Sequence, residues 1–190
     1  MQRSRDPAEK QARILEAAEA LFAEQGFDQT STMQIAERAG VSEGIIFHHF
    51  GSKKGLFQRL GENFAKRAAE ATMPSDKVEL TEEIVVRSAF DFADNNPALY
   101  EALQKGSAEL NMREVTALNR GLIDAISQNL KSAMASGMIR QGDVTIMAEL
   151  QFAVVDAAYR AWRATQNPEL RDRYMHEAVV SMKAMLQHPK

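Results

Sequence analysis

The stretch from Thr32 to Lys53 constrains the fold most, because it contains two short helical patterns joined at a glycine. Ser31 can cap the first helix, and Gln34 can reach back to Ser31 as in a capping box. Gly40 can end this helix, since a turn with positive φ favours glycine. Ser42 can then cap a second helix. The stretch predicts a helix-turn-helix.

Both predicted helices have an apolar face at helical spacing, which predicts burial against the rest of the domain. The residues of this inner face are Ile35, Ala36, Ala39, Ile46 and Phe50. The residues left for the outer face of the second helix are Glu43, Gly44, Phe47 and His49. A helix that exposes such a face beside a supporting helix is suited to entering the major groove of DNA.

Residues 41–54 read Val-Ser-Glu-Gly-Ile-Ile-Phe-His-His-Phe-Gly-Ser-Lys-Lys, which resembles the recognition-helix segment of the TetR family of bacterial transcriptional regulators. The resemblance covers about residues 10–60. It implies an all-α homodimer that binds a palindromic operator in double-stranded DNA, most often as a repressor, under the control of a small-molecule effector. The DNA-contacting residues that it implies are Thr32, Ser42, Glu43, Gly44, Ile45, Phe47, His49 and Lys53.

The implied contacts differ in kind. Thr32 would bind phosphate at the start of its helix, and His49 and Lys53 would hold the DNA backbone, whereas Glu43, Gly44 and Phe47 would lie against the major groove.

Three residues depart from the family pattern. Phe47 stands where tyrosine is usual, so a hydroxyl contact to phosphate is lost. Glu43 stands where a basic or amide residue is common; it either accepts a hydrogen bond from cytosine N4 or avoids the DNA. Ile45 stands where threonine is frequent, and its side chain could pack on a thymine methyl group. The operator sequence therefore does not follow from the resemblance.

Composition limits the classes of function. The net charge is −3 and residues 1–55 carry seven Lys or Arg against eight Asp or Glu, so any DNA affinity must come from the placement of charge. The chain has no cysteine, no signal-peptide pattern and no apolar run approaching about 18 residues. We expect a cytoplasmic protein without membrane contact. No catalytic or phosphate-binding motif and no plausible set of metal ligands appears, which predicts a non-enzyme without metal or cofactor.

The rest of the chain predicts further helices and no strand. Asp6 and Pro7 can start a helix that ends at Gly26, ahead of the helix-turn-helix. Met73-Pro74-Ser75 interrupts the helical pattern. We therefore expect a three-helix DNA-binding domain in residues 1–55, a connecting helix in residues 56–72, and a helical bundle for effector binding and dimerisation in residues 73–190.

The helix expected over residues 143–165 has two apolar sides, which requires burial on two sides. Small residues form one side, and we expect this side and the final helix to meet a second subunit. The residues of the expected dimer interface are Ala153, Ala157, Ala161, Ala178, Met182 and Met185.

Aromatic residues form the other side, which either lines an effector cavity or fills the core. A cavity would suit a largely apolar effector held by a few polar groups. The residues expected to line it are Phe64, Phe90, Leu118, Leu122, Phe152, Asp156, Tyr159 and Trp162.

Two other functions stay open from the sequence. The acidic balance of residues 1–55 is compatible with a helical protein that binds a small molecule but not DNA. The group of Asp156, Tyr159 and Arg160 could instead serve a helical enzyme, although an ion pair four residues apart on one helix is the simpler interpretation.

Overall fold

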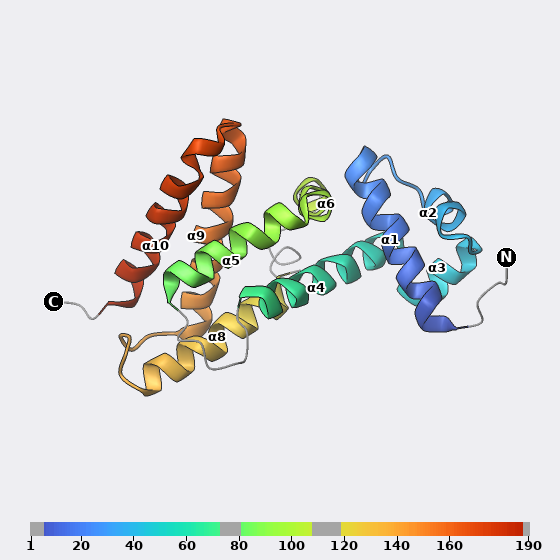
Figure 1. Cartoon of the computed structure of the whole chain (residues 1–190). Coiled ribbons are helices and arrows are strands. Elements are labelled where there is room, and N and C mark those ends of the chain that lie inside the picture. The colour runs from blue at the N-terminus through green and yellow to red at the C-terminus, as the bar shows by residue number, and fades with distance from the viewer. Residues whose placement is uncertain (1–5, 73–80, 108–118, 188–190) are drawn as a thin grey trace. The chain divides into compact units, whose positions relative to one another are not determined.

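The computed structural model describes residues 6–72, 81–107 and 119–187, and every regular element among them is a helix. The expected all-α fold class is confirmed. The contacts divide the chain into two compact units, whose helices are labelled in Figure 1. Unit 1 comprises Met1–Phe64 and Asn96–Asn119; unit 2 comprises Ala65–Asn95 and Arg120–Lys190.

Unit 1 contains α1 (Pro7–Gln25), α2 (Thr32–Ala39), α3 (Glu43–Phe50), the beginning of α4 (Lys53–Thr72) and α6 (Pro97–Ser107). α1 begins where the sequence predicts, whereas α4 begins at Lys53, ahead of the expected residue 56. The Asp6 carboxylate accepts a hydrogen bond from the amide of Ala8 at 2.9 Å, and Ser52 Oγ accepts one from the amide of Gly55 at 2.9 Å. Such caps satisfy amides that have no partner within their own helix.

The core of unit 1 is formed by apolar faces of all these helices. Ile14, Ile35 and Ile46 are fully buried, one from each of the first three helices. The rings of Phe22 and Phe57 meet edge to face with their centroids 5.7 Å apart, a geometry that favours aromatic pairs. This core fixes the helix-turn-helix to α1 and α4.

The assignment of α6 differs from the expected domains, which placed residues 73–190 together. Leu99 of α6 is 2% exposed and belongs to the same buried cluster as Ile14 and Phe22, and Leu103 packs against that cluster. Helical periodicity shows that such a face is buried but not which core buries it. The unit that carries the helix-turn-helix therefore extends beyond residues 1–55.

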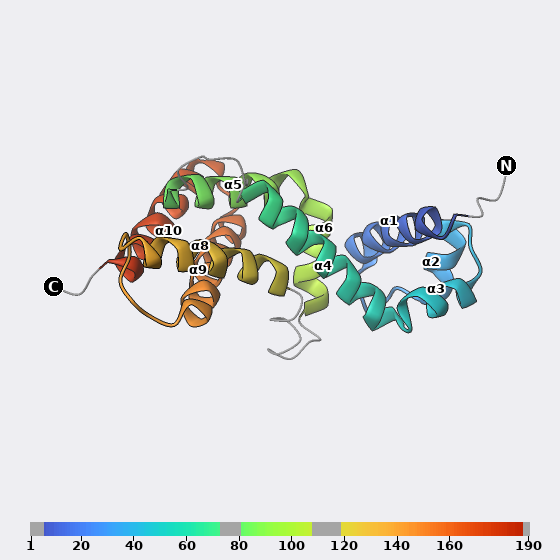
Figure 2. The same ribbon diagram turned by 90° about the horizontal axis from the view of Figure 1, so that it is seen from below.

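Unit 2 contains the end of α4, α5 (Glu82–Asn95), α8 (Arg120–Ala135), α9 (Val144–Thr165), the short 3₁₀ helix η1 (Pro168–Leu170) and α10 (Arg171–Leu186). α9 and α10 lie side by side, and α8 crosses α9 steeply (Figures 1 and 2). Asp143 caps α9 by accepting from the amides of Thr145 and Ile146.

Two buried clusters hold unit 2 together. One cluster joins α8, α9 and the end of α10, with Leu130, Met147 and Leu186 among its buried residues. The other contains Phe90 of α5 with Tyr159 and Trp162 of α9. None of the described helices is long and apolar enough to cross a membrane.

Candidate nucleic-acid interface

The turn between α2 and α3 has the geometry that the sequence predicts. Ser31 and Gln34 form the reciprocal capping box at the start of α2. Gly40 adopts the left-handed conformation with φ of 65°, and its amide donates to Glu37 O. Ser42 occupies the N-cap position of α3 with extended backbone, although its side chain makes no capping hydrogen bond. The two helices therefore form the expected helix-turn-helix.

The two faces of α3 are sharply different. Ile46 is fully buried in the unit 1 core, whereas Phe47, the next residue, exposes 47% of its surface. Ser42, Glu43 and Gly44 are also exposed. The Phe47 ring is therefore accessible to a partner that approaches this face of α3.

No contact within the chain explains why residue 44 is a glycine. It lies inside α3, and a Cβ atom built there would have nothing within 4 Å. Glycine inside a helix costs about 0.8–1.0 kcal/mol relative to alanine. Because neither packing nor backbone conformation requires glycine, its absent side chain leaves room for something outside the chain to approach α3 closely.

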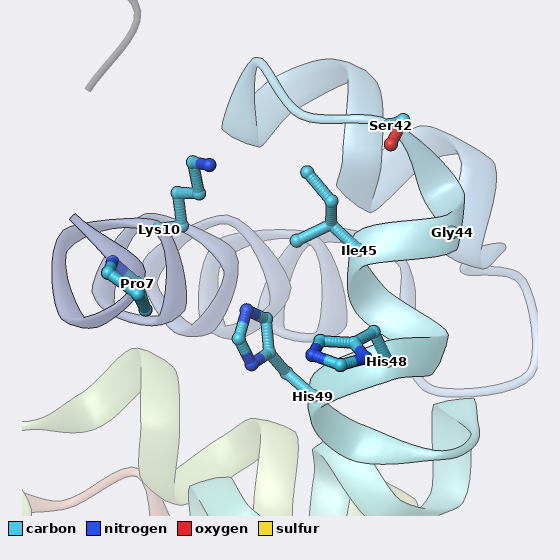
Figure 3. A pocket seen from close by; sticks show the side chains of 7 residues that line it. All are labelled: Pro7, Lys10, Ser42, Gly44, Ile45, His48 and His49. Carbon is cyan, nitrogen blue, oxygen red and sulfur yellow. The ribbon is translucent and has the colours of Figure 1, made fainter. Parts of the chain in front are cut away.

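A hollow of about 310 Å³ lies between the start of α1 and α3 (Figure 3). Lys10 extends over it from α1, while Ile45, His48 and His49 line it from α3. The side-chain amide of Gln11 and Nδ1 of His49 are 3.1 Å apart, which ties α1 to α3. No sequence pattern singles out Lys10 or Gln11, because their position depends on how α1 packs against α3.

Two of the predicted phosphate contacts have partners inside the protein. The Thr32 hydroxyl donates to the Glu43 carboxylate, which links α2 to α3. The Lys53 ammonium donates to the carbonyl oxygens of Phe27 at 2.8 Å and Thr30 at 3.0 Å. These contacts occupy Thr32, Glu43 and Lys53 within unit 1.

One acidic residue of unit 1 is neutralised locally. Arg38 of α2 donates to both carboxylate oxygens of Glu24 on α1, at 2.9 and 2.8 Å. The Arg38 guanidinium beside it holds the pKa of the Glu24 carboxyl below its ordinary value. The pair cancels one charge of each sign, so the net charge of residues 1–55 is unchanged.

The residues expected to line an effector cavity lie in different clusters. Phe64 belongs to unit 1, where the centroid of its ring lies 6.4 Å from the ring centroid of Tyr100. Phe152 and Leu122 pack against the cluster of α8 and α9 in unit 2. Asp156 forms an ion pair with Arg160 at 2.9 Å. Leu118 lies outside the described residues.

The remaining three, Phe90, Tyr159 and Trp162, contact one another. The ring centroids of Phe90 and Tyr159 are 5.2 Å apart, those of Tyr159 and Trp162 5.6 Å, and those of Phe90 and Trp162 5.9 Å. These rings pack as a core in the described conformation. The residues expected to line an effector cavity therefore do not surround one common space in this conformation.

Arg171 and Asp94 form a polar network beside these rings. The Arg171 guanidinium pairs with Asp91 at 2.6 Å and Asp94 at 3.1 Å, and the Tyr159 hydroxyl donates to Asp94 at 2.9 Å. Burial and then the bond to Asp94 raise the pKa of the Tyr159 hydroxyl well above its ordinary value. Desolvation alone would lower the pKa of Arg171, but its acidic partners outweigh this and raise it. The network joins α5, α9 and α10.

The expected dimer residues fall into two groups. Ala153, Ala157 and Ala161 are exposed along α9, as a contact face requires. Ala178 and Met182 are each only 2% exposed because α10 turns them toward the core of its own unit, and Met185 is half-buried. The structure corrects the expectation for Ala178 and Met182, which cannot reach a second subunit in this conformation.

Other exposed apolar residues extend the alanine face. Ile146 and Leu150 continue it toward the start of α9, and they expose 54% and 49% of their surface. Val180 of α10 is 46% exposed. The described residues contain no group of three or more His, Asp or Glu side chains that could hold a metal ion.

Known proteins match both the helix-turn-helix and the whole chain. The family model described as bacterial regulatory proteins, tetR family, matches residues 14–60. The fatty acid metabolism regulator protein of Bacillus subtilis (strain 168) is 26% identical over 161 residues, which cover 80% of this chain and 83% of that protein. A solved TetR-family structure from Shewanella sp. PV-4 superposes with a TM-score of 0.77 at 25% identity, covering 95% of this chain and 99% of that one. Residues 14–60 therefore match the TetR family, and the chain is similar to a solved TetR-family protein over most of its length.

A second relative matches over a shorter length. The transcriptional repressor AcnR of Corynebacterium glutamicum is 39% identical over 74 residues, which are 39% of each chain. The similarity to known regulators thus extends over most of the chain at low identity and is closer over a shorter stretch.

Proposed function

We propose that this chain is a DNA-binding transcriptional regulator of the TetR family that represses transcription in the cytoplasm and reads a palindromic operator as a homodimer. The observation that carries the proposal is the outer face of α3, where Gly44 permits close approach and Phe47 stands exposed. Ile45 and Phe47 would pack on base edges in the major groove, where thymine presents a methyl group. Lys10, across the hollow, would contact phosphate.

A footprint on the DNA that flanks the chain's own gene tests this proposal. The expected result is one protected palindrome whose half-sites are about one helical turn, ~34 Å, apart or somewhat more. Binding should weaken as salt increases, because phosphate contacts release counterions. Protection that is absent, or equal for all sequences, would favour the alternative of a helical ligand-binding protein without operator recognition.

The dimer is proposed to form through the alanine face of α9, extended by Leu150 and by Val180 of α10. Small side chains let two helices approach closely, and the exposed apolar residues would lose contact with water. Ala157→Arg places a charged, bulky side chain at the middle of this face. Sedimentation of that variant as a monomer would support the interface, whereas an unchanged dimer would move the interface elsewhere.

The effector is proposed to be a small, largely apolar molecule that releases the operator. The Bacillus relative is named for fatty acid metabolism, so a long-chain fatty acid, which is small and largely apolar, is the first candidate to test. An effector can act only through a difference in affinity between the two states of the regulator. The rings of Phe90, Tyr159 and Trp162 would have to separate if it bound among them. Operator affinity that is unchanged by long-chain fatty acids would exclude this class of effector.

A further inference from the structure

We propose that Lys53 is a positioning residue rather than a phosphate contact. Its ammonium group holds the loop of residues 27–30 in place and thereby fixes where α2 begins. The inference rests on the proposed DNA binding only for its effect on operator affinity, because its effect on the loop is a property of unit 1 alone.

The Lys53 ammonium has three hydrogens to donate, and two of them meet carbonyl oxygens of the loop at short distance. Nζ lies 2.8 Å from Phe27 O, 3.0 Å from Thr30 O and 3.5 Å from Asp28 O, so the two short bonds are joined by a longer third contact. The same atom lies 4.3 Å from the centroid of the Phe27 ring, which adds a cation–π interaction. A DNA phosphate could bind this ammonium only in competition with the loop carbonyl oxygens.

The loop that Lys53 holds is itself bound to the core. Thr30 is only 1% exposed, and its hydroxyl donates to Gly26 O at 2.7 Å. The ring centroids of Phe27 and Phe57 are 5.1 Å apart. Ser31, the next residue, is the N-cap of α2. A displacement of the loop would therefore move the start of α2 and, through the turn at its end, the groove-facing helix α3.

The electrostatics of α4 explain why a cation is stable at this position. Lys53 is the first residue of α4, where the helix dipole disfavours positive charge. The loop carbonyl oxygens carry the opposite partial charge and lie close enough to offset it. A cation that is already engaged within the protein releases few DNA counterions, so it contributes little to the salt dependence of binding.

The test compares Lys53→Met with Lys10→Met in the full chain. Methionine keeps an unbranched stem over Phe27 but removes the ammonium group. Hydrogen exchange of the amides in residues 27–31 is expected to become on the order of tenfold faster in Lys53→Met and to stay unchanged in Lys10→Met. The slope of log affinity against log salt is expected to stay unchanged in Lys53→Met and to fall by about 0.9 in Lys10→Met.

A second variant keeps the charge and guards against misfolding. Lys53→Arg retains one positive charge, but a planar guanidinium cannot direct three hydrogens from one atom to the loop carbonyls. Faster loop exchange together with weaker operator binding is expected. Native hydrogen exchange and native operator affinity in Lys53→Arg would overturn the positioning role of Lys53, because a simple phosphate contact tolerates arginine.

The remaining outcomes also decide the proposal. If the slope of log affinity against log salt falls by about 0.9 in Lys53→Met, the proposal is overturned, whatever the hydrogen exchange shows. If the unaltered chain binds no operator, the proposed function fails, but the hydrogen-exchange measurement still decides whether Lys53 holds the loop. Unchanged exchange of residues 27–31 in Lys53→Met would then reject it, and faster exchange would support it.

Discussion

Replacing Gly55 with alanine should destabilise unit 1, although alanine is the better helix former. A Cβ atom at Gly55 would lie 2.1 Å from the carbonyl oxygen of Phe50, and Cβ contacts below 3.0 Å essentially never occur. The start of α4 would have to move away from the end of α3. Leu56 and Phe57 follow directly and are 0% and 1% exposed, so this movement would disturb the core.

The expected cost follows from two opposing effects. Overpacking of this kind typically costs about 1–3 kcal/mol, and the buried neighbours Leu56 and Phe57 place Gly55→Ala at the upper end. The better helix propensity of alanine returns at most about 1 kcal/mol. We therefore expect a net loss of about 2 kcal/mol in the free energy of unfolding.

Gly121→Ala is the matched control in the other unit. Gly121 lies near the start of α8, and its Cβ would meet only Ala65 Cβ, at 4.0 Å. This variant should gain about 0.4–1 kcal/mol, because alanine restricts the unfolded chain and fits the helix. Urea unfolding followed by circular dichroism measures both variants, while the fluorescence of Trp162, the single tryptophan, reports on unit 2. Gly55→Ala with native stability would refute the reasoning.

Two further predictions concern the polar network of unit 2. Arg171→Met removes the ion pairs with Asp91 and Asp94 and should lower the free energy of unfolding by about 1–2 kcal/mol, after allowance for partial exposure. Arg173 is exposed, so Arg173→Met should leave the stability unchanged. Trp162 fluorescence during unfolding in urea measures both variants. Because the pKa of Tyr159 is raised on folding, its contribution to stability is complete below about pH 10 and is lost as the pH rises toward the folded pKa. Absorbance at alkaline pH should therefore show one of the three tyrosines resisting ionisation until unfolding, and Tyr159→Phe should abolish that resistant step.

Features that depend on neighbours in the sequence were predictable. The capping box of Ser31 and Gln34, the left-handed Gly40 and the start of α9 at Asp143 all appear as expected. Each arises from contacts within a few residues, so residue type and spacing determine them. The helix-turn-helix and the all-α fold class follow from these local signals together with helical periodicity.

Features that depend on distant contacts were not predictable. Lys53 meets Phe27 across 26 residues, and Arg171 meets Asp91 across 80 residues. A charged residue at a helix start looks the same in sequence whether it binds phosphate or loop carbonyls. Similarly, periodicity showed that Met182 is on an apolar face but not that its own unit buries it.

The aromatic side of α9 illustrates the same limit for the candidate effector site. The sequence placed Tyr159 and Trp162 on one face but left open whether that face lines a cavity or fills a core. The ring of Phe90, which contacts both, comes from α5 and is brought there by tertiary packing. Helical spacing alone does not contain this information.

Operator binding by Gly44→Met tests the central claim that α3 is the DNA-reading helix. Nothing in the chain lies within 4 Å of a Cβ at this position, so the variant should fold with native or slightly higher stability. Its affinity for the footprinted operator, measured by fluorescence anisotropy at fixed salt, should fall about tenfold or more, because the added side chain would separate α3 from the groove. Gln128→Met, an exposed change on α8, should bind as the unaltered chain does. Native operator affinity in Gly44→Met would contradict the account.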